Sequence, residues 1–249
     1  MTDDTCLIGI IAALPGEVAP LLRRVRQSSS FVVKGQHMVT GNIAGVPVVL
    51  THTGIGMKRA ARGCHCLFAH QPVTHLLCIG IAGGLTPGLS PADLLLARDV
   101  MHSDGQMAPP PDPAWLQQAL RVDELVAGTL VTHSRVAGTP KEKTALRELC
   151  RSDENACVDM ETAAFASAAA KRRVPYLALR AVSDSANEPL PGILTQVVEP
   201  GGNVAPLTIL RFVFTDPRGG VALVRLGFRF RRCTGRLAVA AERLIRAMV

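Results

Sequence analysis

The chain has 249 residues, of which 48% are hydrophobic, and this is enough to bury the core of one α/β domain. Its N-terminus opens with acidic residues and has only a short apolar run before Pro15, unlike a signal peptide. A transmembrane helix is not expected either, because no stretch of about 18 apolar residues occurs. Seven scattered cysteines suit a reducing cytoplasm better than a disulfide framework. We therefore expect a cytoplasmic protein with a single domain over residues 1–249.

The net charge of +7 is distributed unevenly along the chain. Residues 207–249 contain nine Arg, no Lys and only two acids, Asp216 and Glu242, so this segment carries the whole net charge. We expect it to be mainly helical, with its arginines either facing water or contacting anionic lipid at the inner membrane, two interpretations that the pattern favours equally. Nucleic acid is not expected as a partner, because few aromatic side chains are present to stack on bases.

Short apolar runs alternate with helical patterns in the first half of the chain, which predicts a sheet covered by helices. The near-continuous apolar run over 6–14 predicts a strand that is buried on both faces. Pro15 and Gly16 then turn the chain into a short helix. The patterns that follow predict strands over 37–45 and 46–54, a helix over 56–70, and buried strands over 74–84 and 91–100.

The second half continues the alternation of helix and strand. A helix is expected near Trp115–Val122, a strand near Gly128–Val136, and a helix that opens at Thr139, where Pro140 and Glu142 complete a good start signal. The remaining patterns predict a strand over 156–160, an Ala-rich helix over 161–173 and a buried strand over 174–184.

Carboxylates follow three of the predicted buried strands. Glu17, Glu161 and Asp184 each lie where a strand ends, and ligands of open α/β sheets collect at such ends. A carboxylate held by a rigid strand end suits acid–base chemistry. Each residue also has a structural alternative, because Glu17 and Glu161 could simply favour a helix N-terminus and Asp184 could be a helix cap.

A metal site is not expected. Cys64, His65 and Cys66 are close in sequence, but residues 64 and 66 do not share one face of the predicted helix, and no second Cys pair follows at zinc spacing. The glycines of TGIG and GIAGG match neither a phosphate-binding loop nor a dinucleotide fingerprint.

The segment VDMETAAFASAAAKRRVPYLALRAVSD resembles the signature of the purine nucleoside phosphorylase and methylthioadenosine/adenosylhomocysteine nucleosidase superfamily. IGIIAALPGEVAPLL, TGIGMKRAA and GIAGGLTPGLSPADLLLARDV match the same family in the same order, so the resemblance covers roughly residues 6–190. It implies a three-layer α/β/α sandwich with a central mixed, partly barrel-like sheet. It also implies cleavage of the N-glycosidic bond of a purine nucleoside, and by family habit a homo-oligomer.

The resemblance implies a role for each matching residue. Met160 would pack against the ribose and Glu161 would accept hydrogen bonds from its hydroxyls. Asp184, oriented by Ser183, would protonate or hydrogen-bond the purine N7 as the base leaves. These roles agree with the chemistry, since the departing base needs a proton and the ribose becomes oxocarbenium-like.

Glu17 and Arg180 would flank the incoming nucleophile, and Gly54 and Gly83 would lie at the substrate. No cofactor is expected, but phosphate is an alternative to water as co-substrate. The carboxylate of Glu17 would repel phosphate, whereas Arg180 and the backbone N–H groups of the turn over 53–56 could hold it.

The chain departs from the nucleosidases at Ile81, where that family typically has Ser. This feature and the C-terminal pattern LRFVFTDPRGGVALVRLGFRFRRC resemble the hopanoid-associated phosphorylase subfamily. That resemblance implies an adenosine-type nucleoside, such as the lipid-linked adenosylhopane, as substrate. The alternative is a non-catalytic nucleoside-binding or membrane-surface module on the same fold.

Overall fold

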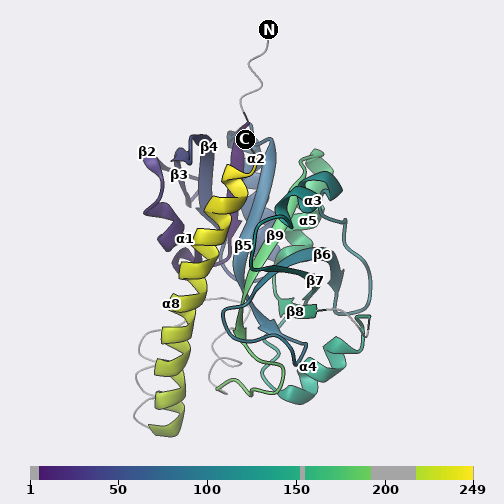
Figure 1. Cartoon of the computed structure of the whole chain (residues 1–249). Helices are drawn as coiled ribbons and strands as arrows, with labels where there is room; N and C mark the ends of the chain where they lie inside the picture. The colour runs from purple at the N-terminus through teal and green to yellow at the C-terminus, as the bar shows by residue number, and fades with distance from the viewer. Residues whose placement is uncertain (1–5, 152–154, 192–216, 249) are drawn as a thin grey trace.

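The computed structural model describes residues 6–151, 155–191 and 217–248, with the side chains of the last segment described from Arg225 onward. Figure 1 shows a central sheet with helices on both sides. The strands are β1 (Ile8–Ala12), β2 (Arg26–Val33), β3 (Gln36–Ile43), β4 (Val46–His52), β5 (His75–Gly84), β6 (Leu94–His102), β7 (Leu125–Thr132), β8 (Asn155–Asp159) and β9 (Tyr176–Asp184).

The helices of the described part are α1 (Pro15–Leu22), α2 (Met57–His70), α3 (Pro113–Ala119), α4 (Pro140–Arg147), α5 (Thr162–Arg172) and α8 (Pro217–Arg246). The start signal at α4 operates as expected, since Thr139 and Glu142 form a reciprocal capping box behind Pro140. None of these helices combines the length and the apolar character needed to cross a bilayer.

The sheet is mixed and closes on itself at one end. Its strand order is β2-β3-β4-β1-β5-β8-β7-β6-β9, and β5 also pairs with β9, so that five strands form a closed barrel and four extend from it. Strands β1, β4, β5 and β9 run parallel, which brings their carboxyl ends to the same edge. This topology confirms the expected partly barrel-like sheet.

Two apolar cores separate the layers. The first contains α1, α3 and α8 side chains packed on one face of the sheet, and includes Trp115, Leu237 and Leu244. The second lies beneath α2 and α5 on the opposite face and includes Leu67 and Phe165. In Figure 1, α8 runs along the front of the sheet beside α1, while α2 and α5 lie behind it. The expected three-layer α/β/α arrangement is therefore confirmed.

One strand, β2, was not predicted from the sequence. β2 has the sequence RQSSSFVV and is exposed along most of its length, as an edge strand can be, so it shows no apolar alternation. Its register is set by β3, not by a buried face of its own. The boundary of β7 also differs from the expectation, because the strand begins at Leu125 and ends at Thr132.

The basic C-terminal segment is helical where the structure describes it. α8 spans Pro217–Arg246 and buries Cys233, Leu237 and Ile245 against the sheet. Residues 207–216, which were expected to belong to the same segment, lie outside the described residues.

Gly128 offers a test of the barrel. A Cβ at this position would lie 2.3 Å from the backbone oxygen of Asn155, on the neighbouring strand. We expect Gly128→Ala to lower the free energy of unfolding by about 1–3 kcal/mol through overpacking, as measured by urea denaturation. Gly235→Ala in α8 is the control, because its Cβ would meet nothing within 4 Å and should stabilise the helix. Equal stabilities would contradict this account of the barrel.

Candidate active site

A cavity of about 420 Å³ opens at the carboxyl ends of the parallel strands. This volume falls in the range of small-molecule sites. Apolar side chains form most of its wall, and the main ones are Leu14, Ile55, Ile81, Val136, Met160, Leu190, Leu226 and Phe230. A few polar side chains interrupt this wall, namely Glu17, Arg135, Asp159, Glu161, Ser183 and Asp184. The three carboxylates singled out in the sequence therefore meet at one cavity.

Glu17 is held by backbone donors. Its Oε2 accepts the N–H groups of Ala13 and Leu14 at 3.1 and 2.8 Å, and its Oε1 accepts that of Ile81 at 2.9 Å. The side chain is 3% exposed, and burial raises its pKa above the ordinary value despite these donors and the charge of Arg180. A carboxylate with a raised pKa accepts a proton more readily than an ordinary glutamate does.

Glu161 lies at the start of α5, directly after Met160, and both line the cavity. Its Oε1 accepts the backbone N–H of Gly56 at 2.7 Å. Burial and the neighbouring Asp159 raise the pKa of Glu161 to about 8, so that the free site keeps a proton on this group at neutral pH.

Asp184 ends β9 and is fully packed among polar partners. The Ser183 hydroxyl hydrogen-bonds to its Oδ1, and the ammonium of Lys143 lies 2.5 Å from its Oδ2. Lys143, on α4, is 1% exposed at its side chain. Asp184 is therefore a strand residue in a buried ion pair and not a helix cap.

The position of Arg180 differs from the expected one beside the nucleophile. Its guanidinium lies beneath the cavity and does not line it, and the side chain is 2% exposed. Its Nε and Nη2 contact Asp159 Oδ2 at 3.0 and 2.9 Å, and its other N–H groups reach Thr162 Oγ1 and two backbone carbonyls. Four hydrogen bonds and the ion pair to Asp159 thus hold the guanidinium within the protein.

The two glycines singled out in the sequence have different places. Gly83 lines the cavity beside Asp184, whereas Gly54 does not line it. Three backbone N–H groups of the turn around Gly54 already have hydrogen-bond acceptors. Those of Thr53 and Gly54 donate to backbone carbonyls, and that of Gly56 donates to Glu161. These three groups are consequently not offered to phosphate in this structure.

Three parts of the site were missed in the sequence. Lys143 reads there as an ordinary polar residue of α4, and only its spacing from Leu146, which is also buried, hinted at an inward position. Asp159 was passed over as the end of a strand. Leu226 and Phe230 of α8 line the cavity from far along the chain, which no local pattern could indicate. Within the described ranges, no cluster of His, Cys, Asp and Glu is arranged to hold a metal.

A pocket that gathers buried carboxylates with raised pKa values at strand ends is typical of an enzyme that moves protons on a small ligand. The chain belongs to the phosphorylase superfamily, whose family model matches residues 7–200. It is accordingly an enzyme of the nucleoside phosphorylase and nucleosidase class.

Individual relatives agree with this assignment. A 5'-methylthioadenosine/S-adenosylhomocysteine nucleosidase of Geobacillus kaustophilus is 32% identical over 204 residues, covering 72% of this chain and 84% of the relative. One of Shewanella denitrificans is 29% identical over 205 residues, covering 74% and 88%. The Streptococcus pneumoniae nucleosidase in complex with 8-aminoadenine superposes with a TM-score of 0.77 at 25% identity, covering 96% and 99%.

Glu161 makes the stability of the site depend on pH. Its pKa is about 8 in the folded protein and close to 4.5 when unfolded, so the folded state holds the proton more tightly. The stabilisation is present at low pH and is lost as the pH rises through 8. We expect the free energy of unfolding of Glu161→Gln to fall less than that of the wild type between about pH 5 and pH 8. The free energies of unfolding are measured by urea denaturation at each pH. An equal fall for the two proteins over this pH range would contradict the raised pKa of Glu161.

Proposed function

We propose that this enzyme cleaves the N-glycosidic bond of a purine nucleoside and releases the free base, with adenine as the expected base. The observation that carries the proposal is the meeting of Glu17, Glu161 and Asp184 at one largely apolar cavity. The names of the relatives, which are nucleosidases of adenine-containing nucleosides, support it.

The positions of the carboxylates match the demands of the reaction. Met160 and Glu161 adjoin each other and are assigned to the ribose, where Glu161 accepts the hydroxyl hydrogen bonds. Asp184, with Ser183, is assigned to the N7 side of the purine. Glu17 is assigned to the nucleophile, since its raised pKa suits a general base. Arg180 acts beneath them as a positioning residue, because it holds Asp159 and its charge lowers the pKa of both Glu17 and Glu161.

Water is the nucleophile that the electrostatics favour over phosphate. The guanidinium of Arg180 is bound within the protein, and three N–H groups of the turn around Gly54 are occupied. Glu17 would repel a phosphate dianion. Arg135 is the one cation on the described lining, but its side chain is 71% exposed and its guanidinium lies 3.5 Å from Glu142. Phosphorolysis therefore lacks a prepared anion site among the described residues.

Product analysis tests whether the reaction is hydrolysis and whether Asp184 delivers the proton to the leaving base. With adenosine derivatives, the wild type should release adenine and free ribosyl product at the same rate with and without phosphate. Asp184→Asn should lose about 10²-fold or more in kcat, because an amide cannot deliver a proton to N7. Detection of a ribose 1-phosphate would overturn hydrolysis. Wild-type rates in Asp184→Asn would remove Asp184 as the acid, and no base release by the wild type would favour a non-catalytic binding module.

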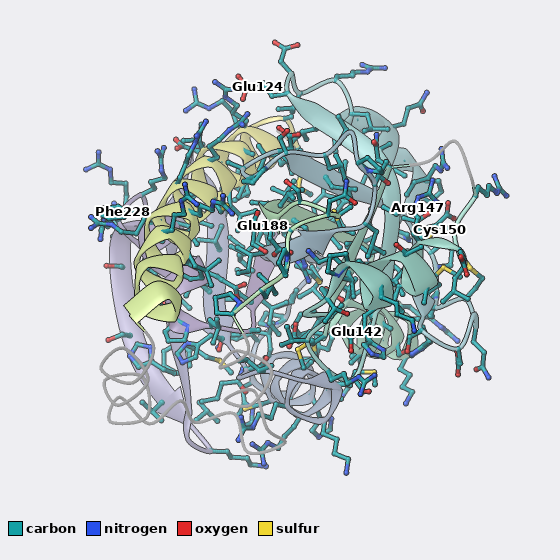
Figure 2. All side chains as sticks on the ribbon, turned by 90° about the horizontal axis from the view of Figure 1, so that it is seen from below. Glu124, Glu142, Arg147, Cys150, Glu188 and Phe228 are labelled. Atoms are coloured by element: carbon teal, nitrogen blue, oxygen red, sulfur yellow. The ribbon has the colours of Figure 1, made fainter. Side chains whose placement is uncertain are left out.

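A lipid-linked purine nucleoside such as adenosylhopane is the proposed substrate. The support comes from α8, where Leu226 and Phe230 line the cavity while Phe228, on the same turn, is 69% exposed. Figure 2 shows Phe228 at the outer edge of the molecule, away from Glu188. Arg225, Arg231 and Arg232 are also exposed. An apolar side chain among cations suits peripheral contact with an anionic bilayer, close to the cavity. Self-association of the chain stays a prediction from the family resemblance.

Co-sedimentation with anionic liposomes tests the α8 surface. Each Arg near such a membrane contributes about 1 kcal/mol, so replacing Phe228, Arg231 and Arg232 with Ser should weaken binding on the order of tenfold or more. Binding by the wild type should also fall at high salt. Replacing the exposed Lys171 and Arg172 at the end of α5 with Ser is the matched control and should have little effect. Absence of wild-type binding would contradict the membrane contact.

A further inference from the structure

Among the described residues, Lys143 is a buried cation that has no assigned role in the proposed reaction. It projects from α4 and is 1% exposed at its side chain. Its ammonium contacts Asp184 Oδ2 at 2.5 Å and the backbone oxygens of Ser185 and Glu188 at 2.7 and 2.9 Å. These three acceptors satisfy all three donors of an ammonium group.

The contact between Lys143 and Asp184 bears on the source of the proton that a leaving purine base must receive. Asp184 Oδ2 accepts a hydrogen bond from the Lys143 ammonium, and Asp184 Oδ1 accepts one from the Ser183 hydroxyl. A proton can pass along such a hydrogen bond from the ammonium to the carboxyl group, and from the carboxyl group to a base in the cavity. Lys143 is therefore placed to supply the proton that Asp184 delivers to a leaving purine.

The ion pair of Lys143 and Asp184 reaches the cavity through Asp184, which lines it. A Cβ on Gly83, which lines the cavity, would lie 3.3 Å from Asp184 Oδ2 and 3.7 Å from Oδ1. The oxygen that touches Lys143 is thus also close to the cavity wall. Lys143 itself does not line the cavity, so it can reach a ligand only through Asp184.

We propose that Lys143 is the proton source for the departing base and that Asp184 relays its proton. The inference rests on the proposed nucleoside cleavage. As the C1′–N9 bond breaks, its electron pair moves to the purine. One proton passes from Lys143 Nζ to Asp184 Oδ2 and on to N7, which leaves a neutral amine and a neutral base. Water bonds to C1′ and gives its own proton to Glu17. Glu17 then releases that proton to solvent, and Lys143 regains one from solvent, so the enzyme returns to its starting state.

The same contacts anchor the segment that follows β9. Lys143 holds the backbone of Ser185 and Glu188, and the N–H of Leu190, which lines the cavity, donates to the Gly138 oxygen at 2.9 Å. The Glu188 carboxylate in turn pairs with Arg229 of α8. Loss of Lys143 could therefore disturb the cavity wall as well as the proton supply, and the experiment must separate the two effects.

Two substrates separate the effects within one variant. A purine nucleoside needs a proton on its leaving group, whereas p-nitrophenyl riboside leaves as a stable phenolate. We expect Lys143→Met to lose about 10²–10⁴-fold in kcat on the nucleoside and to keep most of its rate on the p-nitrophenyl riboside. Lys143→Arg keeps the charge but cannot release a proton, so it should show the same selective loss. Lys141→Met, at an exposed position of the same helix, is the matched control.

A double variant tests whether the effect of Lys143 on nucleoside cleavage passes through Asp184. If Lys143 acts through Asp184, Lys143→Met should cost little further activity in an Asp184→Asn background. Equal losses on both substrates, or near wild-type nucleoside cleavage by Lys143→Arg, would overturn the relay and leave Lys143 as a structural anchor. A wild type that cleaves p-nitrophenyl riboside but no purine nucleoside would instead overturn the proposed function, and the relay with it.

Discussion

The buried ion pair between Arg180 and Asp159 is the interaction on which the site depends. It joins β9 to β8 across the barrel, and Thr132 of β7 and Thr162 of α5 complete its hydrogen bonds. An ion pair in a dry interior costs several kcal/mol in desolvation per charge and is stable only when its remaining donors and acceptors are satisfied, as they are here. The pair thus fixes strand ends that carry carboxylates of the cavity, and its cation lowers the pKa of Glu17 and Glu161 against the effect of burial.

The location of the site was predictable from the sequence because strand ends are local features. Glu17, Glu161 and Asp184 each follow an apolar run, and a parallel arrangement of such runs brings their ends together. The direction of a side chain is a different matter. Arg180 belongs to the same strand as Asp184, but it points into the barrel because Asp159, 21 residues earlier, neutralises it there. Nothing in the sequence near Arg180 specifies that partner.

Contacts between distant segments explain the other differences. Lys143 lies 41 residues before Asp184, and its amphipathic helix shows only that one face is buried, not that an ammonium occupies that face. α8 returns to the sheet from the end of the chain and packs against α1, β5 and β9. Its residues Leu226 and Phe230 thereby form part of a cavity whose described polar side chains come from earlier parts of the chain. The chemistry is set by the sheet, whereas the apolar side of the cavity is set partly by the C-terminal helix.

The balance of charge at this site bears on which reaction it can support. In the part of the chain that the structure describes, four carboxyl groups line the cavity, those of Glu17, Asp159, Glu161 and Asp184. Two buried cations of the same part lie behind it, one against Asp159 and the other against Asp184. Each cation is thus matched to a single carboxylate, and among the described residues Glu17 and Glu161 have no ion-pair partner of their own. Burial raises the pKa of both above the ordinary value, so each holds a proton more readily than an exposed glutamate does. A positively charged ribose would favour their ionised forms, whereas an anionic nucleophile would oppose them. Such a site would stabilise charge that develops in the transition state more than charge that a co-substrate brings with it. This balance supports the proposal that water, which arrives neutral, is the nucleophile.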